Sequence, residues 1–137
     1  MEKNSNSDDD IIFMREALKE AKKAYNKKEV PVGVVLVKEG KIVSRGHNNK
    51  ENKNNPLGHA EIIAINKYCK KNNTWRLNDI TMYVTLEPCL MCSAIIQQVR
   101  IRKSCNRNSG FSRKSRWKRK KNLRRIRNSS SFRSFRE

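Results

Sequence analysis

The sequence predicts an α/β protein in which a mixed β-sheet is covered by packed helices. Helical and strand patterns follow one another in the order α-β-β-α-β-α between residues 8 and 99. The pattern at residues 32–37 is almost uniformly apolar, which is typical of a strand covered on both faces. A length of 137 residues allows one domain, or one domain and a tail.

The first helix is predicted to begin after Asp8, Asp9 and Asp10. Their side chains supply N-cap chemistry, and their negative charge suits the positive end of the helix dipole. Apolar residues then recur at intervals of three and four, which predicts a helix of about four turns with one stripe facing the core. The residues of this stripe are Ile11, Met14, Leu18, Ala21 and Tyr25.

A β-hairpin is predicted next. Residues 32–37 form its first strand, Glu39 and Gly40 its turn, and residues 41–45 its return strand. Residues 46–57 are predicted to be a loop, because five asparagines lie between positions 48 and 55 and Pro56 follows them.

The remaining elements are a helix, a strand and a second helix. The first of these helices is predicted over HAEIIAINKYCKKN, which starts at His59 and becomes basic at its end, as the helix dipole favours. The strand is predicted over NDITMYVTLE, where apolar residues alternate with threonine and tyrosine. The last helix is predicted over CLMCSAIIQQV, which starts at Cys89.

Two clusters of metal-binding residue types lie at the starts of these helices. His59 begins one helix, and Cys89 and Cys92 begin the next after Pro88, a residue tolerated at a first helical position. Two cysteines three apart lie on one face of a helix, whose positive end favours the thiolates that a metal needs. One imidazole and two thiolates leave a fourth zinc position open for water, which is typical of a catalytic zinc site.

Glu61 is predicted to be the catalytic residue of this site. It lies two residues after His59, on roughly the opposite side of the helix, and is therefore poorly placed to be a fourth ligand. A carboxylate there is better suited to take a proton from water and to return it to a leaving group.

A CxxC pair is also typical of a redox site or of half a structural zinc site. A structural site needs a second ligand pair, and His47, Cys69 and Cys105 are not paired at metal-binding spacing. A thioredoxin-like redox pair would leave the histidine and glutamate cluster unexplained. Both alternatives stay open, and the catalytic zinc site is favoured over them.

Three blocks of the sequence resemble zinc-dependent nucleoside deaminases, and bacterial tRNA-specific adenosine deaminases in particular. The blocks are PVGVVLVKEGKIVSRGHN, PLGHAEIIAI and TLEPCLMCSAIIQQVRI. They include the HxE…PCxxC signature of these enzymes and cover about residues 10–102. The resemblance implies a three-layer, cytidine-deaminase-like fold, with a mixed sheet and helices on both faces.

The resemblance also implies site residues and a reaction. His59, Cys89 and Cys92 match the ligands of one Zn²⁺ per chain, Glu61 matches the proton shuttle, and Asn48 matches a position that hydrogen-bonds the purine. The implied reaction converts adenosine to inosine and ammonia by attack of water at C6, at the wobble position (A34) of a tRNA anticodon. The implied partners are the tRNA anticodon stem-loop and a second copy of the chain, because family members act as homodimers.

The substrate stays open among relatives with the same metal ligands. Guanine deaminases and deoxycytidylate deaminases share HxE and PCxxC-like segments. Pyrimidine nucleoside deaminases often carry a cysteine in place of the histidine, which His59 argues against. An inactive, truncated remnant that binds RNA non-specifically is a further alternative.

The chain departs from the family after residue 102. We expect an incomplete deaminase domain at residues 1–102, truncated after the third strand and third helix, and a basic, low-complexity, disordered tail at residues 103–137. Residues 102–137 hold 15 Lys+Arg and one Glu, whereas residues 1–101 hold 17 Lys+Arg and 12 Asp+Glu. The strand at residues 80–86 is then expected to be an exposed apolar edge, and activity to be impaired.

A change of reading frame near residue 103 is the favoured explanation of this tail. Of the 34 residues from 103 to 136, 26 are Arg, Lys, Ser or Asn, and codons for all four can begin with AA or AG. The alternative is a genuine tail that binds RNA through its cations and its interspersed aromatic residues.

The sequence also predicts a compartment. No stretch of eighteen apolar residues predicts a membrane span, and the N-terminal residues do not resemble a secretion signal. The four cysteines are therefore expected in the reducing cytoplasm, where metal binding or catalysis is more typical than a disulfide.

Overall fold

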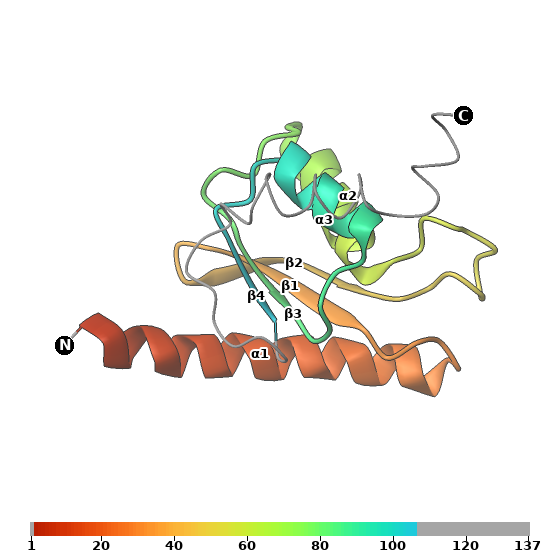
Figure 1. Cartoon of the computed structure of the whole chain (residues 1–137), viewed down its shortest axis with the longest axis horizontal. Helices are drawn as coiled ribbons and strands as arrows, with labels where there is room; N and C mark the ends of the chain where they lie inside the picture. Colours follow the sequence, from red (N-terminus) through yellow and green to blue (C-terminus); the bar gives the residue numbers. More distant parts are fainter. Residues whose placement is uncertain (1, 107–137) are drawn as a thin grey trace, which may run out of the picture.

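The computed structural model describes residues 2–106, which form a four-stranded mixed sheet and three helices (Figure 1). The strand order is β2-β1-β3-β4, with β1 antiparallel to both of its neighbours and β3 parallel to β4. None of the three helices in residues 2–106 combines the length and the hydrophobicity that a membrane span requires. The expectations for residues 107–137 lie outside the described part. The elements in chain order are α1 (Glu2–Asn26), β1 (Gly33–Lys38), β2 (Lys41–His47), α2 (Ala60–Asn72), β3 (Thr81–Val84), α3 (Leu90–Gln98) and β4 (Lys103–Asn106).

The helices lie on opposite faces of the sheet. Helix α1 runs along one face, and α2 and α3 lie together on the other (Figure 1). Strand β1 is covered on both faces, as its uniformly apolar sequence predicts. Val34 and Leu36 belong to the apolar cluster formed with α2 and α3, whereas Val35 and Val37 belong to the cluster formed with α1. The predicted α/β class, with three layers, is confirmed.

A fourth strand corrects the prediction that the sheet ends after the third strand and third helix. Strand β4 pairs with β3 along its whole length, and its Cys105 is fully buried beneath α1. Strand β3 therefore lies between two strands, and the expectation that it forms an exposed edge is wrong. The pattern missed β4 because Lys103, Ser104 and Asn106 are polar. Backbone pairing and one buried side chain define this strand.

Helix α1 begins earlier than predicted, and it buries Met14 and Ala21 of the predicted stripe but not the two residues at the ends of that stripe. It starts at Glu2, so the three aspartates lie within the helix rather than before it. Ile11 and Tyr25, which were predicted to face the core, are 43% and 69% exposed. The predicted stripe is therefore wrong at both ends. The apolar residues that α1 buries are Met14, Ala17, Ala21 and Ala24.

Polar contacts also hold α1 against the sheet. Asp10 is buried, accepts a hydrogen bond from the Tyr83 hydroxyl and pairs with Lys103 at 3.6 Å. Burial and the nearby Asp10 carboxylate raise the pKa of Tyr83. The hydroxyl therefore stays protonated at neutral pH and continues to donate to Asp10. These contacts tie the first helix to β3 and β4.

Gly33 lies where the backbone of α1 approaches the sheet closely. A Cβ at this position would lie 2.0 Å from Ala17 O and 2.3 Å from Ala21 N, which are backbone atoms. We expect Gly33→Ala to lower the free energy of unfolding by about 3 kcal/mol, because the helix must move. Gly40→Ala is the control, since its Cβ meets open space and only its φ of 76° is unfavourable. That variant should lose about 1 kcal/mol. Urea denaturation measures both losses, and equal losses would contradict this packing.

Candidate metal centre

His59 is positioned by the start of α2. It is the N-cap of that helix, with an extended backbone (φ −80°, ψ 142°), but its side chain does not bond the helix's first N–H groups. Asn48, from the preceding loop, supplies that contact instead, because its Oδ1 accepts a hydrogen bond from Ala60 N at 2.8 Å. The His59 imidazole is therefore not needed to cap the helix.

Cys89 and Cys92 are positioned by the start of α3. Cys89 is the N-cap of that helix, and Cys92 lies in its first turn. Pro88 precedes the cap, so it does not occupy the first helical position that was predicted for it. Cys92 is fully buried, whereas Cys89 is exposed. The pair therefore extends from the core to the surface.

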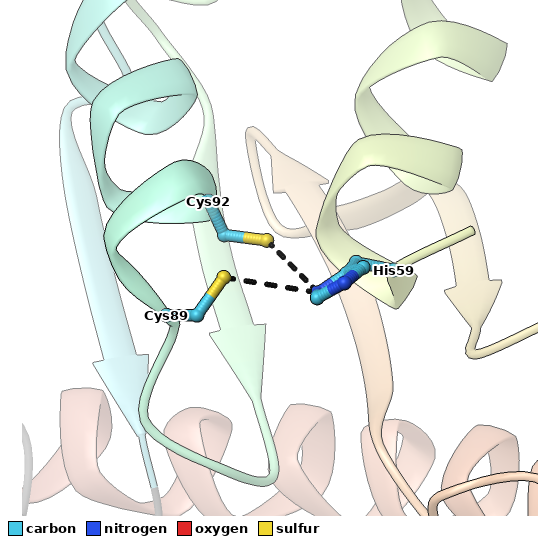
Figure 2. Close-up of side chains that lie close together, drawn as sticks. All are labelled: His59, Cys89 and Cys92. Carbon is cyan, nitrogen blue, oxygen red and sulfur yellow. Dashed lines mark hydrogen bonds between the residues drawn. The ribbon is translucent and has the colours of Figure 1, made fainter. Parts of the chain in front are cut away.

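The three predicted ligands converge on one point. The His59 ring is directed at both cysteine sulfurs, with Nδ1 3.8 Å from Cys89 Sγ and 3.6 Å from Cys92 Sγ (Figure 2). All three ligand atoms lie within 4.8 Å of one another. Zinc bonds of about 2.3 Å to sulfur and about 2.0 Å to nitrogen, at a tetrahedral angle, place those atoms about 3.6 Å apart. The donor set and its spacing fit one zinc ion with three protein ligands.

Glu61 reaches the same point from the first turn of α2. Its side chain is buried, and Oε2 lies 3.1 Å from Cys92 Sγ. The predicted separation of His59 and Glu61 on opposite sides of a helix does not apply, because His59 caps the helix from outside. Burial, together with the Glu61 carboxylate, raises the pKa of Cys92. Zinc binding must therefore displace a proton from this thiol.

A pocket of about 220 Å³ opens at this point, next to His59 and Cys89, and Asn48 lines its wall. Its volume is below the range of about 300–1,000 Å³ that is typical of pockets for drug-sized ligands. Among the described residues that line it, carboxylates outnumber cations four to one, so the walls disfavour a phosphate group. The charged lining residues are Glu29, Lys50, Glu51, Glu61 and Glu87.

The remaining histidine and cysteines of the described part lie away from this centre. His47 ends β2 and contacts Glu20 and Lys27, each at 3.3 Å. Cys69 packs against the larger apolar cluster, as predicted, and Cys105 is buried beneath α1. None of the three joins the ligand cluster found among residues 2–106. The second ligand pair of a structural zinc site is therefore not present in that range.

Glu29 is one of the pocket residues that were not predicted from the sequence. Glu29 precedes β1, is buried and lines the pocket beside the metal centre. No metal or catalytic motif includes it. The sequence signals that could have pointed to Glu29 are its place directly before VPVGVV and the asparagine-rich segment further along the chain. The structure shows that Glu29 binds this segment, at Asn52 N.

Fold and site together define a class of α/β metalloproteins whose three ligands lie at the starts of two helices, with one coordination position left for water. The chain belongs to the cytidine and deoxycytidylate deaminase family, since the sequence model of that family's zinc-binding region matches residues 7–106. The match confirms the resemblance and supports zinc as the metal. It also includes β4, beyond the expected end at residue 102.

Curated relatives of the chain include tRNA-specific adenosine deaminases. The enzyme of Streptococcus pyogenes serotype M18 is 49% identical over 94 residues, which are 69% of this chain and 59% of the relative. The enzyme of Bacillus subtilis strain 168 is also 49% identical over 94 residues, which are 69% of this chain and 58% of the relative. The chain therefore spans less than two thirds of the length of these relatives.

Solved structures of similar proteins share the fold. One comes from a study of A-to-I editing by tRNA:A34 deaminases at the wobble position; it is 39% identical with a TM-score of 0.68, over 74% of this chain and 80% of that chain. A guanine deaminase from Bacillus subtilis is 35% identical, also with a TM-score of 0.68, over 70% of this chain and 62% of that chain. The mixed sheet and its helices are thus common to both.

Proposed function

We propose that this chain is a zinc-dependent hydrolase that deaminates adenosine to inosine at the wobble position of tRNA. The observation that carries the proposal is the convergence of His59, Cys89 and Cys92 with the Glu61 carboxylate at one pocket. The substrate is supported by the relatives named tRNA-specific adenosine deaminases, which are 49% identical to the chain over 94 residues.

Glu61 carries the proton transfer in the proposed reaction. A bound zinc ion supplies Lewis-acid activation of a water molecule. The Glu61 carboxylate accepts a proton from the attacking water and delivers it to the amino group. A C6–O bond forms, the C6–N bond breaks, and the amino group leaves as ammonia. Because Glu61 is only 3% exposed, bulk water does not compete for its carboxylate.

Asn48 is proposed to bind the purine through its amide nitrogen. Its Oδ1 is already occupied by the N–H of Ala60, and no residue of the described part bonds its Nδ2. The side chain lines the pocket. It therefore offers a hydrogen-bond donor to an acceptor atom of the base, such as a ring nitrogen.

Two substitutions of Asn48 separate this binding role from the helix cap. Asn48→Asp keeps an acceptor for Ala60 N, so we expect the free energy of unfolding to change by about 0.5 kcal/mol or less. It removes the donor, so substrate affinity should fall about tenfold, the equivalent of one hydrogen bond. Asn48→Ala should in addition lose about 1 kcal/mol of stability. Thermal unfolding and substrate titration test this; wild-type affinity in Asn48→Asp would contradict the proposed contact.

The charges of the pocket favour a base over a nucleotide phosphate. Acidic walls repel phosphate, so a free nucleotide such as deoxycytidylate is a poorer candidate. In a tRNA the phosphates remain outside the pocket while one unstacked base enters it.

Guanine deamination is the second candidate function. The similarity to the Bacillus subtilis guanine deaminase favours it, because that likeness covers 70% of this chain with the same TM-score as the tRNA:A34 deaminase structure. Guanine is also an uncharged purine and suits the same pocket walls. The third candidate is an inactive remnant that binds RNA non-specifically.

We infer a homodimer from the resemblance to the family, and a cytoplasmic location from the four cysteines, which are expected in a reducing compartment. The deaminase domain is proposed to include β4, so the change of reading frame that was predicted near residue 103 is now proposed to follow β4, with the basic tail after it. Translating the other two frames of the gene downstream of codon 102 tests this origin. If neither frame continues with strand and helix patterns, the tail is genuine.

Ammonia release from defined substrates tests the proposed function. Purified, zinc-loaded protein is incubated with an anticodon stem-loop that carries a wobble adenosine, with guanine, and with deoxycytidylate. Release from the stem-loop alone is expected. Release from guanine alone supports the second candidate, and no release from any of the three supports the remnant. A stem-loop with guanosine in place of the wobble adenosine is the matched control.

A further inference from the structure

Glu29 is a buried carboxylate that the proposed reaction does not use. Its Oε1 accepts hydrogen bonds from the backbone N and the side-chain Nδ2 of Asn52, both at 2.7 Å. Its Oε2 accepts one from Glu51 N at 3.2 Å. The Asn52 side chain also donates to Lys27 O, directly after the end of α1, at 3.0 Å. Donors of the loop between β2 and α2 therefore occupy both oxygens, although the residue lines the pocket.

The loop that Glu29 binds is compact in itself. Asn49 N donates to Gly58 O at 2.9 Å, which closes the segment between them. A Cβ on Gly58 would lie 2.8 Å from Lys50 Cα, so the two ends of the loop are in direct contact. The hydrogen bonds to Glu29 attach this closed loop to the rest of the domain.

The bonds to Glu29 require an ionised carboxylate. The backbone N–H of Asn52 contributes most to lowering the pKa of Glu29, and together with the other loop donors it outweighs the effect of burial. At neutral pH the residue is therefore charged and accepts from every donor that faces it. A glutamine would have to turn its own NH₂ group toward one of these N–H donors.

The attached loop carries part of the pocket wall. Lys50 and Glu51 line the pocket, and Asn48 lies at the start of the same loop. We propose that Glu29 is a positioning residue for substrate binding, which holds residues 48–52 in place so that the substrate meets a preformed pocket. The identity of that substrate rests on the proposed function.

Loss of this attachment is expected to weaken binding more than chemistry. In Glu29→Gln the loop should occupy its present position only part of the time, and apparent affinity falls by that fraction. We expect KM for the anticodon stem-loop to rise roughly tenfold, while kcat changes by less than about threefold. Zinc content should stay at one ion per chain. Asn52→Ala keeps the carboxylate but removes one donor, and should shift KM in the same direction by a smaller factor.

Hydrogen exchange followed by mass spectrometry provides a readout that needs no substrate. Peptides covering residues 48–58 should exchange faster in Glu29→Gln than in wild type, while peptides from β1 and β3 stay protected. Glu16→Gln is the matched control. Glu16 is a partly buried carboxylate of α1 that does not line the pocket, and its Oε2 accepts a hydrogen bond from Arg45 Nη1 at 3.0 Å. It should leave both the loop peptides and KM unchanged.

The outcomes separate this inference from the proposed function. Unchanged exchange of residues 48–58 in Glu29→Gln would overturn the positioning role, as would equal losses of kcat and zinc with an unchanged KM. If the wild-type protein deaminates none of the three substrates, the proposed function fails. The exchange comparison between Glu29→Gln and Glu16→Gln then still decides whether Glu29 positions the loop.

Discussion

Cys92→Ser will bind zinc more weakly than wild type by at least about 100-fold and will lose deaminase activity in parallel. The loss is expected to exceed the 10–100-fold cost that is typical of removing a residue which only orients a metal ligand. Cys92 Sγ lies 3.6 Å from His59 Nδ1 in a fully buried position, so its loss would leave the metal only two of the three converging ligands. His59→Ala should have the same effect from the opposite side of the site.

Cys69→Ser is the matched control for this experiment. Cys69 lies on α2, packs partly buried against the larger apolar cluster and is not among the converging ligands. Its substitution should leave zinc stoichiometry unchanged. Zinc affinity is measured by competition with a chromophoric chelator. Equal zinc loss in both cysteine variants would show that general destabilisation, rather than ligation, explains the result.

Glu61→Gln will retain zinc and lose most of the catalytic rate. Glutamine has nearly the same shape as glutamate but cannot take a proton from water, so kcat should fall by about 10²–10⁴-fold. Zinc content should remain at one ion per chain, because His59, Cys89 and Cys92 are untouched. Single-turnover kinetics on the zinc-loaded variant separates the chemical step from binding.

The catalytic rate and the zinc content of Glu61→Gln together distinguish a proton-transfer residue from a metal ligand. Rate loss with retained zinc is expected of a proton-transfer residue. Loss of zinc together with rate would instead make Glu61 a ligand or a residue that supports one, which its 3.1 Å contact with Cys92 Sγ would then explain. A kcat within a few-fold of wild type would contradict the proposed mechanism.

Local patterns predicted the elements that carry the site. The apolar run at residues 32–37 predicts a strand covered on both faces, and the CxxC at a helix start predicts two sulfurs on one side of α3. Both depend on neighbours in the sequence, and the structure has both: β1 joins an apolar cluster on each face, and the two sulfurs lie 3.8 and 3.6 Å from His59 Nδ1. The convergence of His59 with these two cysteines was predicted from the donor types that zinc requires. The two clusters can meet because α2 and α3, at whose starts they lie, pack on the same face of the sheet.

Other features depend on contacts between distant segments, which no local pattern contains. The side that α1 buries is decided by the close approach of its backbone to Gly33, which favours Ala17 and Ala21 over larger residues. Strand β4 depends on pairing with β3, because most of its side chains are polar. The bond from Asn48 to the start of α2 likewise joins the loop to a helix twelve residues away.

The coordination of the metal tests the central claim most directly. X-ray absorption at the zinc K-edge of purified, zinc-loaded protein reports the number and type of atoms bound to the ion. We predict two sulfur atoms at about 2.3 Å, one imidazole nitrogen at about 2.0 Å and one further light atom in the fourth position. A spectrum with four sulfur atoms, with no imidazole, or from protein that binds no stoichiometric zinc would contradict the account.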